Sequence, residues 1–160
     1  MIIDLVLPLP VTLNKLTHNN NTKNGGRSGR SKTKRAKEWY REASHFVIPF
    51  RRAHQKYCNQ CLDESLRYFN HGKKAVDLPS LHGANMGLAY KVEYGYWFES
   101  ERHKLPRDIA NYEKQLSDFL VDMGFMVDDS FIEDMRLYRS GTDCVNPRVE
   151  IKIEKINLFS

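Results

Sequence analysis

The chain has 160 residues, of which 41% are hydrophobic and 28% are charged, and its formal net charge is +5. This composition is sufficient for one packed core, and it excludes a wholly disordered chain. No apolar run in the sequence approaches the about 20 residues that are needed to span a membrane. The three cysteines do not make a disulfide framework. Because the start, Met1–Asp4, lacks a basic segment, we expect no signal peptide, no membrane partner and a cytoplasmic location.

The positive charge is concentrated in one segment. Between Lys23 and Lys56 there are eleven basic residues and two acidic ones, which leaves 14 basic and 18 acidic residues for the rest of the chain. Such a block beside an acidic body is typical of a protein that binds a polyanion, because each phosphate contact releases condensed counterions. The alternative is a solvated tail without a partner. The pattern favours nucleic acid as the partner.

The N-terminal half is expected to hold one strand and two helices. The first apolar run is bounded by Pro8 and Pro10, which is typical of a strand stopped by proline. Ser31 is a plausible N-cap, and we expect Pro49 to interrupt the helix that follows it. In chain order we predict a strand at 2–9, a polar glycine-rich loop at 19–29, a helix from 31, and a second helical stretch to 69, with 70–86 unassigned.

The C-terminal half shows clearer periodicity. Residues 88–98 alternate between large apolar and other side chains, which indicates a strand, and the tyrosine-rich face is expected to be buried. A helix is predicted at 108–123, with Gly124 placed to end it. Two further strands are predicted at 131–139 and 148–156. The expected fold is therefore α+β, with one mixed sheet and helices packed on it.

Two groups of acidic residues are candidates for a metal site. Asp108 stands at the start of the predicted helix, and the pair Asp128–Asp129 follows one helix length later, with Lys114 between them. Magnesium prefers oxygen ligands and keeps several waters, so two or three carboxylates suffice, and an ammonium group nearby stabilises charge on a phosphate. The alternatives are an ordinary N-cap, a plain turn and a solvated lysine.

Three stretches together resemble a known family. They are a proline-rich opening strand at 7–15, a basic helix at 31–43, and a segment at 107–114 with a later acidic pair at 128–129, which is similar to the pattern Asp-x-Asp-Asn-x-x-Lys and Asp-Asp. On these stretches the chain resembles the RusA-type Holliday-junction resolvases, small metal-dependent endonucleases of bacteria and their prophages. The resemblance covers 1–48 and 88–156 and implies one domain, 1–160, with 50–87 as an insertion.

The resemblance implies roles by position. It makes Asp108 and Asp129 metal ligands, Asp128 an accessory acid, Asn111 a residue that orients the site, and Lys114 the catalytic lysine. It also implies Mg²⁺, with Mn²⁺ as a substitute, a homodimer, and hydrolysis of a DNA four-way junction by a metal-activated water in recombination and repair. The DNA-contacting residues that we expect are Asn14, Lys15, Lys32, Lys34, Arg35, Lys37 and Arg107.

One position departs from the family pattern. The second aspartate falls on Ala110, which can neither bind a metal nor activate water. We therefore expect impaired cleavage with DNA binding retained, and the intact surroundings favour deliberate replacement over natural loss. A non-catalytic protein that binds branched DNA is the main alternative function, and a phage protein that binds an acidic protein is another.

The remaining motif is a lone CxxC. Cys58 and Cys61 have His71 and His82 downstream, but no second close pair of ligands completes a tetrahedral zinc site. The spacing therefore favours reduced cysteines on a helix over zinc.

Overall fold

The computed structural model describes residues 1–12, 17–19, 30–70, 72, 88–101 and 108–157. Their main element is a four-stranded sheet in the order β1-β6-β4-β5. Strand β6 pairs antiparallel with both β1 and β4, whereas β4 and β5 are parallel. The strands are β1 (Ile2–Pro8), β4 (Leu88–Phe98), β5 (Ile132–Thr142) and β6 (Arg148–Asn157).

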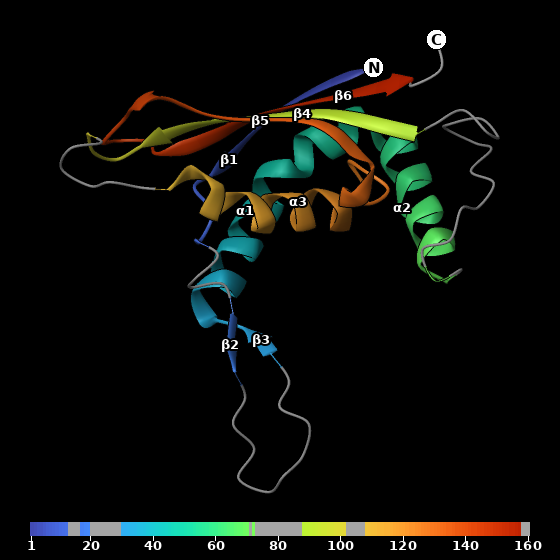
Figure 1. Cartoon of the computed structure of the whole chain (residues 1–160), viewed down its shortest axis with the longest axis horizontal. Coiled ribbons are helices and arrows are strands. Elements are labelled where there is room, and N and C mark those ends of the chain that lie inside the picture. The colour runs from blue at the N-terminus through green and yellow to red at the C-terminus, as the bar shows by residue number, and fades with distance from the viewer. Residues whose placement is uncertain (13–16, 20–29, 71, 73–87, 102–107, 158–160) are drawn as a thin grey trace, which may run out of the picture.

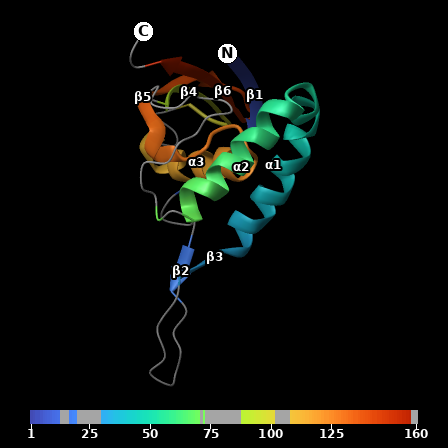
Figure 2. The ribbon, with the colours of Figure 1, turned by 90° about the vertical axis from the view of Figure 1, so that its right-hand side faces the viewer.

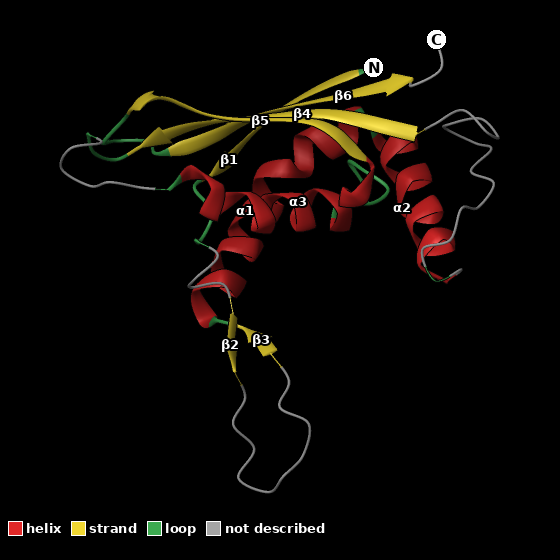
Figure 3. Cartoon of the chain, viewed as in Figure 1, coloured by secondary structure: helices red, strands yellow, loops and turns green. Residues whose placement is uncertain are grey.

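The helices lie together on one face of this sheet (Figures 1 and 2). A small two-stranded ribbon of β2 and β3 projects away from the sheet, next to the start of α1 (Figure 3). The mixed sheet with packed helices confirms the predicted α+β class. The helices are α1 (Lys34–Ala53), α2 (Gln55–Asn70) and α3 (Glu113–Asp122), and the ribbon strands are β2 (Thr17–Asn19) and β3 (Arg30–Lys32).

The predicted buried face of β4 is confirmed. Tyr90, Tyr94, Tyr96 and Phe98 are fully buried in the core between sheet and helices. From the helix side, Leu116, Phe119 and Leu120 of α3 complete this core. Since large aromatic rings contribute much of the apolar area that folding removes from water, the burial of this tyrosine-rich strand contributes strongly to the stability of the fold.

Two expectations for α1 are wrong. Ser31 lies in β3, and the N-cap is Thr33, whose hydroxyl accepts a hydrogen bond from the N–H of Ala36 at 3.2 Å. Pro49 lies inside the helix, which continues to Ala53. A proline removes its own N–H donor and its ring crowds the carbonyl four residues earlier, and the buried side chain of Val47 helps to hold the helix against the core despite this cost.

The helix predicted at 108–123 begins later than expected. Residues Ile109–Tyr112 form a 3₁₀ turn, and the α-helix α3 begins at Glu113. Asp108 explains the difference, because its carboxylate accepts from the N–H of Ala110 at 3.1 Å while its carbonyl accepts from the N–H of Asn111 at 3.2 Å. These short-range bonds favour the tighter turn.

A buried glutamine fixes the position of α3. The side chain of Gln115 accepts a hydrogen bond from the N–H of Val11 at 2.7 Å and donates to the carbonyl of Ala36 at 3.3 Å. It thereby links α3 to the residues after β1 and to the first turn of α1. Because a buried polar side chain is costly unless paired, these two bonds define one favoured position for the helix that carries Lys114.

Candidate active site

A pocket of about 470 Å³ lies beside α3 and brings together several of the predicted site residues. It is formed by the end of β3, the C-terminal half of α2, one side of α3 and the turn after Val127. Its lining combines acidic and basic side chains with apolar ones. The lining residues are Lys32, Ser65, Leu66, Phe69, Lys114, Asp118, Val121, Asp122, Asp128 and Asp129.

Lys114 lies between two of the aspartates that line the pocket. Its ammonium Nζ lies 2.8 Å from Oδ1 of Asp118 and 2.8 Å from Oδ2 of Asp129. Partial burial acts to lower the pKa of Lys114, but the hydrogen bonds and charges of the two aspartates outweigh burial and raise the pKa above its ordinary value. A positive charge is therefore held beside the acidic pair.

A second group of contacts joins two lining residues of the pocket, Lys32 and Asp122, to Tyr40 of α1. The hydroxyl of Tyr40 donates to Oδ2 of Asp122 at 2.7 Å, and the ammonium of Lys32 lies 4.9 Å from the centre of the same tyrosine ring. Burial, and then the carboxylate of Asp122, raise the pKa of the Tyr40 phenol. Tyr40 thus connects the basic helix α1 to Asp122 of α3, and the ammonium of Lys32 lies next to its ring.

Most of the other predicted site residues that the structure describes do not line the pocket. Asp108 and Ala110 are exposed at the start of the 3₁₀ turn, and Asp108 does not line the pocket. Of the expected DNA contacts, Lys32 lines the pocket and Lys34 pairs with Glu38 at 3.8 Å on the exposed side of α1. Arg35 and Lys37 are also exposed on α1, Asn111 is half-buried, and Asn14, Lys15 and Arg107 lie outside the described residues.

The observed caps match the alternative interpretations of two aspartates. Asp108 caps the 3₁₀ turn, and Oδ1 of Asp128 accepts from the N–H of Ser130 at 3.0 Å. Within the described part of the chain, no group of three or more histidine, cysteine or acidic residues is arranged to hold a metal ion. The carboxylates of Asp128 and Asp129 are nevertheless the oxygen donors that magnesium prefers, and a magnesium ion needs only one or two of them in addition to water.

Sequence reasoning missed two acidic residues of the site. Asp118 and Asp122 follow Lys114 at intervals of four residues, so the three side chains share one face of α3. The spacing i, i+4, i+8 was the available signal. The apolar pair Leu66 and Phe69 was also missed, because residues on α2 gave no functional pattern.

Helix α2 supports the turn that carries Asp128 and Asp129. The hydroxyl of Tyr57 donates to the carbonyl of Phe125 at 3.3 Å, and the hydroxyl of Tyr90 accepts from the N–H of Val127 at 3.2 Å. Both bonds are buried. They hold the backbone directly before the acidic pair, so that α2 and β4 position the turn together.

The cysteines of the CxxC motif lie on the buried face of α2, the helix that supports the turn. Cys58 and Cys61 are free thiols, fully buried on α2. Burial raises the pKa of both thiols, that of Cys61 to about 12. Since zinc binds the thiolate, these surroundings favour packing over metal binding.

Gly124 provides a test of the contact between α2 and the turn. Its φ is +78°, and a Cβ there would lie 2.5 Å from the carbonyl oxygen of Cys58. Left-handed backbone alone costs a residue other than glycine about 1–3 kcal/mol. We expect Gly124→Ala to lower the free energy of unfolding by more than this, measured by urea denaturation.

Gly72 is the matched control for this substitution. Its φ is +65°, but nothing lies within 4 Å of an added Cβ. Gly72→Ala therefore reports the backbone strain without the clash. Equal losses of stability in the two variants would show that α2 does not press on Gly124.

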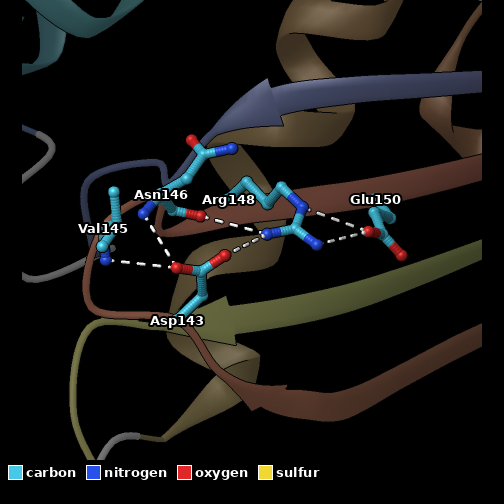
Figure 4. Close-up of polar contacts among 5 residues, drawn as sticks. All are labelled: Asp143, Val145, Asn146, Arg148 and Glu150. Atoms are coloured by element: carbon cyan, nitrogen blue, oxygen red, sulfur yellow. Dashed lines mark hydrogen bonds and ion pairs between the residues drawn. The ribbon is translucent and has the colours of Figure 1, made fainter.

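The opposite end of the sheet is fixed by a charged turn between β5 and β6 (Figure 4). Oδ1 of Asp143 accepts from the N–H groups of Val145 and Asn146, at 3.1 and 3.0 Å, and Oδ2 lies 2.8 Å from the guanidinium of Arg148. Arg148 also pairs with Glu150 and lies 4.7 Å from the ring centre of Trp97. The N–H of Asp143 donates to the carbonyl of Phe98, so the turn also holds the end of β4.

This turn gives a pH-dependent prediction. Hydrogen bonds from the backbone N–H groups, with the charge of Arg148, keep the pKa of Asp143 below its ordinary value. A lowered pKa in the folded state contributes stability above the unfolded value of about 3.9, and this contribution is lost as pH falls through the folded pKa. We expect wild type to be more stable than Asp143→Asn at pH 6, with the difference shrinking below pH ~4. Urea denaturation at several pH values measures it, and a constant difference would contradict it.

Comparisons with known proteins place the chain in one family. Residues 17–154 match the family described as Endodeoxyribonuclease RusA, which is well over half of the chain. No curated protein matches the sequence. Among the described residues, no helix has the length and hydropathy needed to cross a bilayer. On the extent of the family match, and with the mixed sheet and packed helices that the resemblance implied, the chain belongs to the RusA endodeoxyribonuclease family.

Proposed function

We propose that this protein binds four-way DNA junctions and that its pocket beside α3 is a magnesium-dependent cleavage site, impaired here by Ala110. The family is one of Holliday-junction nucleases that act on branched DNA with a divalent metal, generally Mg²⁺. The observation that carries the proposal is the ammonium of Lys114 held 2.8 Å from both Asp118 and Asp129, in a pocket that Lys32 also lines.

The acidic residues supply the oxygen donors of the proposed site. Asp129 and the accessory acid Asp128, which line the pocket, would hold Mg²⁺ or Mn²⁺, with Asp108, which lies outside this lining, expected as a further ligand. When bound, the metal polarises the phosphate and lowers the pKa of an attacking water. The acids Asp118, Asp122, Asp128 and Asp129 line the pocket with two lysines, so the charges of the lining side chains leave it net negative and suited to a divalent cation.

Lys114 acts on the phosphate by its charge. Its ammonium group lies between two carboxylates, where it can stabilise negative charge that develops on the scissile phosphate or on the leaving oxygen. Asn111 lies three residues earlier and is proposed to orient the site. The position of Lys114 is supported by Gln115 and by the buried face of α3, which fix the helix against the core.

The basic residues of α1 and β3 bind the DNA backbone. Lys32 lies at the pocket, and Lys34, Arg35 and Lys37 are exposed on the adjoining first turn of α1. Phosphate contacts position a nuclease on its substrate without reading sequence. Asn14, Lys15 and Arg107 are expected to extend this surface. We also propose a homodimer, since two symmetric nicks match a two-fold arrangement, and a cytoplasmic location in a bacterial cell, where the DNA is accessible.

A non-catalytic junction-binding protein is the second candidate. Ala110 favours it, because this exposed position carries no carboxylate beside Asp108. The two candidates share the DNA surface and differ only in cleavage.

Salt-dependent binding tests the shared part of the proposal. We expect the affinity for a four-way junction to exceed that for linear duplex, and the logarithm of the binding constant to fall steeply with the logarithm of salt concentration, by about 0.9 per phosphate contact. Fluorescence anisotropy with labelled DNA measures both. Lys32→Ala should reduce the slope by about one contact, whereas Lys152→Ala, at an exposed lysine of β6, should not. A shallow slope for wild type would favour an acidic protein partner instead.

A further inference from the structure

The C-terminal half of α2 exposes two large apolar side chains at the pocket. Leu66 is 62% exposed and Phe69 is 70% exposed, and both line the same pocket as Lys114 and Asp129. Burying such a side chain stabilises a folded protein, and the fold does not use this stabilisation at two positions of one helix. Their position beside the proposed cleavage site suggests a role in substrate binding.

Helix α2 is firmly held where these side chains project. Tyr57, Cys58, Cys61 and Glu64 form its buried face. Near its C-terminal end, the ring of Tyr68 packs on the ring of Phe131, with centroids 4.9 Å apart. Phe131 closes the 3₁₀ turn that begins at Asp129. The part of α2 that carries Leu66 and Phe69 is therefore held next to the turn of the acidic pair.

The lining of the pocket holds two chemically different groups of side chains. Lys32, Lys114 and the aspartates are charged, whereas Leu66 and Phe69 of α2 and half-buried Val121 of α3 are apolar. A ligand that fits both groups has an anionic part and a flat apolar part next to each other. A nucleotide has this combination, with a phosphate for the lysines and a base for the aromatic ring.

We propose that Phe69 and Leu66 form an apolar platform that receives an unstacked base at the branch point of the DNA. The inference rests on the proposed function of the pocket. Stacking of a base on an aromatic side chain stabilises binding by about 1–3 kcal/mol. Taking a base out of a continuous duplex costs a few kcal/mol, and this cost is smallest where pairing or stacking is already disturbed. The platform therefore favours branched DNA over linear duplex.

The test compares Phe69→Ala with wild type and with Phe69→Tyr, which keeps the ring. Phe46→Ala is the matched control, since Phe46 is 48% exposed on α1 but lies outside this pocket. Affinities for a four-way junction and for linear duplex are measured by fluorescence anisotropy at one salt concentration in the absence of divalent metal. A junction with 2-aminopurine at the branch point reports unstacking through its fluorescence.

We expect Phe69→Ala to weaken junction binding by roughly 5- to 150-fold, as the stacking free energy implies, with duplex binding unchanged and the 2-aminopurine response lost. Phe69→Tyr should bind as wild type does, and Phe46→Ala should change neither affinity. An equal loss on junction and duplex, or no loss on the junction, would overturn the platform. A change in oligomeric state on sedimentation would overturn it in favour of a protein interface.

The controls separate this inference from the proposed function. If wild type itself binds junction and duplex equally, the proposed junction selectivity fails. If wild type is selective and Phe69→Ala is equally selective, only the platform fails. The folding of each variant is checked by urea denaturation, and because Phe69 is 70% exposed, its truncation removes little buried area and Phe69→Ala is expected to fold.

Discussion

Replacing Ala110 with aspartate is expected to raise the rate of magnesium-dependent junction cleavage by at least about 100-fold, on the scale of one key electrostatic stabiliser of a transition state. The new carboxylate would stand two residues after Asp108, at an exposed position of the 3₁₀ turn. Because the position is exposed, the substitution buries no charge. The site would gain the metal ligand that the family pattern places there.

The measurement is a single-turnover assay with a labelled four-way junction and Mg²⁺. Ala110→Asn is the matched control, since it adds nearly the same volume without the charge, and we expect it to remain as slow as the parent chain. Junction affinity in the absence of metal should stay within a few-fold for both variants. A cleavage rate that does not rise with Ala110→Asp would show that this position is not what limits catalysis.

The second large effect is expected at Lys114. In the Ala110→Asp background, Lys114→Gln should lower the cleavage rate by about 10²- to 10³-fold, which is the usual cost of removing one preorganised group that stabilises developing charge. The ammonium now lies 2.8 Å from both Asp118 and Asp129, so its loss leaves two carboxylates without their shared counterion.

We expect Lys114→Gln to affect the cleavage rate much more than the affinity for the junction. Junction binding depends on many phosphate contacts and should change only a few-fold, while the single-turnover rate falls. Lys152→Ala is the control, because this lysine is exposed on β6 and does not line the pocket. Unchanged cleavage in Lys114→Gln would assign the lysine a role only in pairing the two aspartates.

The four strands of the main sheet were predictable because their pattern is local, whereas the short strands β2 and β3 were not predicted. The alternation at 88–98 reports a strand with one buried face, and both β1 and β6 were found within two residues of their expected ends. Pro49 was misjudged because tertiary packing on both sides of a proline can preserve a helix that propensity alone would end. The start of α3 was misjudged because hydrogen bonds at Asp108 decide between a 3₁₀ and an α turn.

The site was predictable only in part. The spacing of Asp108, Lys114 and the pair Asp128–Asp129 predicted one site, and the structure brings Lys114 and the pair into one pocket that Asp108 does not line. The contributions of Asp118, Asp122 and α2 depend on how separate helices pack, which no short motif encodes. Tyr40 illustrates this, since its contact with Asp122 joins residues 82 positions apart.

The most direct test of the account is anomalous diffraction from crystals of the Ala110→Asp variant soaked in Mn²⁺. We expect a single strong peak within about 2.0–2.3 Å of a carboxylate oxygen of Asp129, as oxygen ligands of such hard cations require, with Asp108 or the new aspartate as a second ligand. A peak away from Asp129, or none at Mn²⁺ concentrations that support cleavage, would contradict the assignment of this pocket as the site of cleavage.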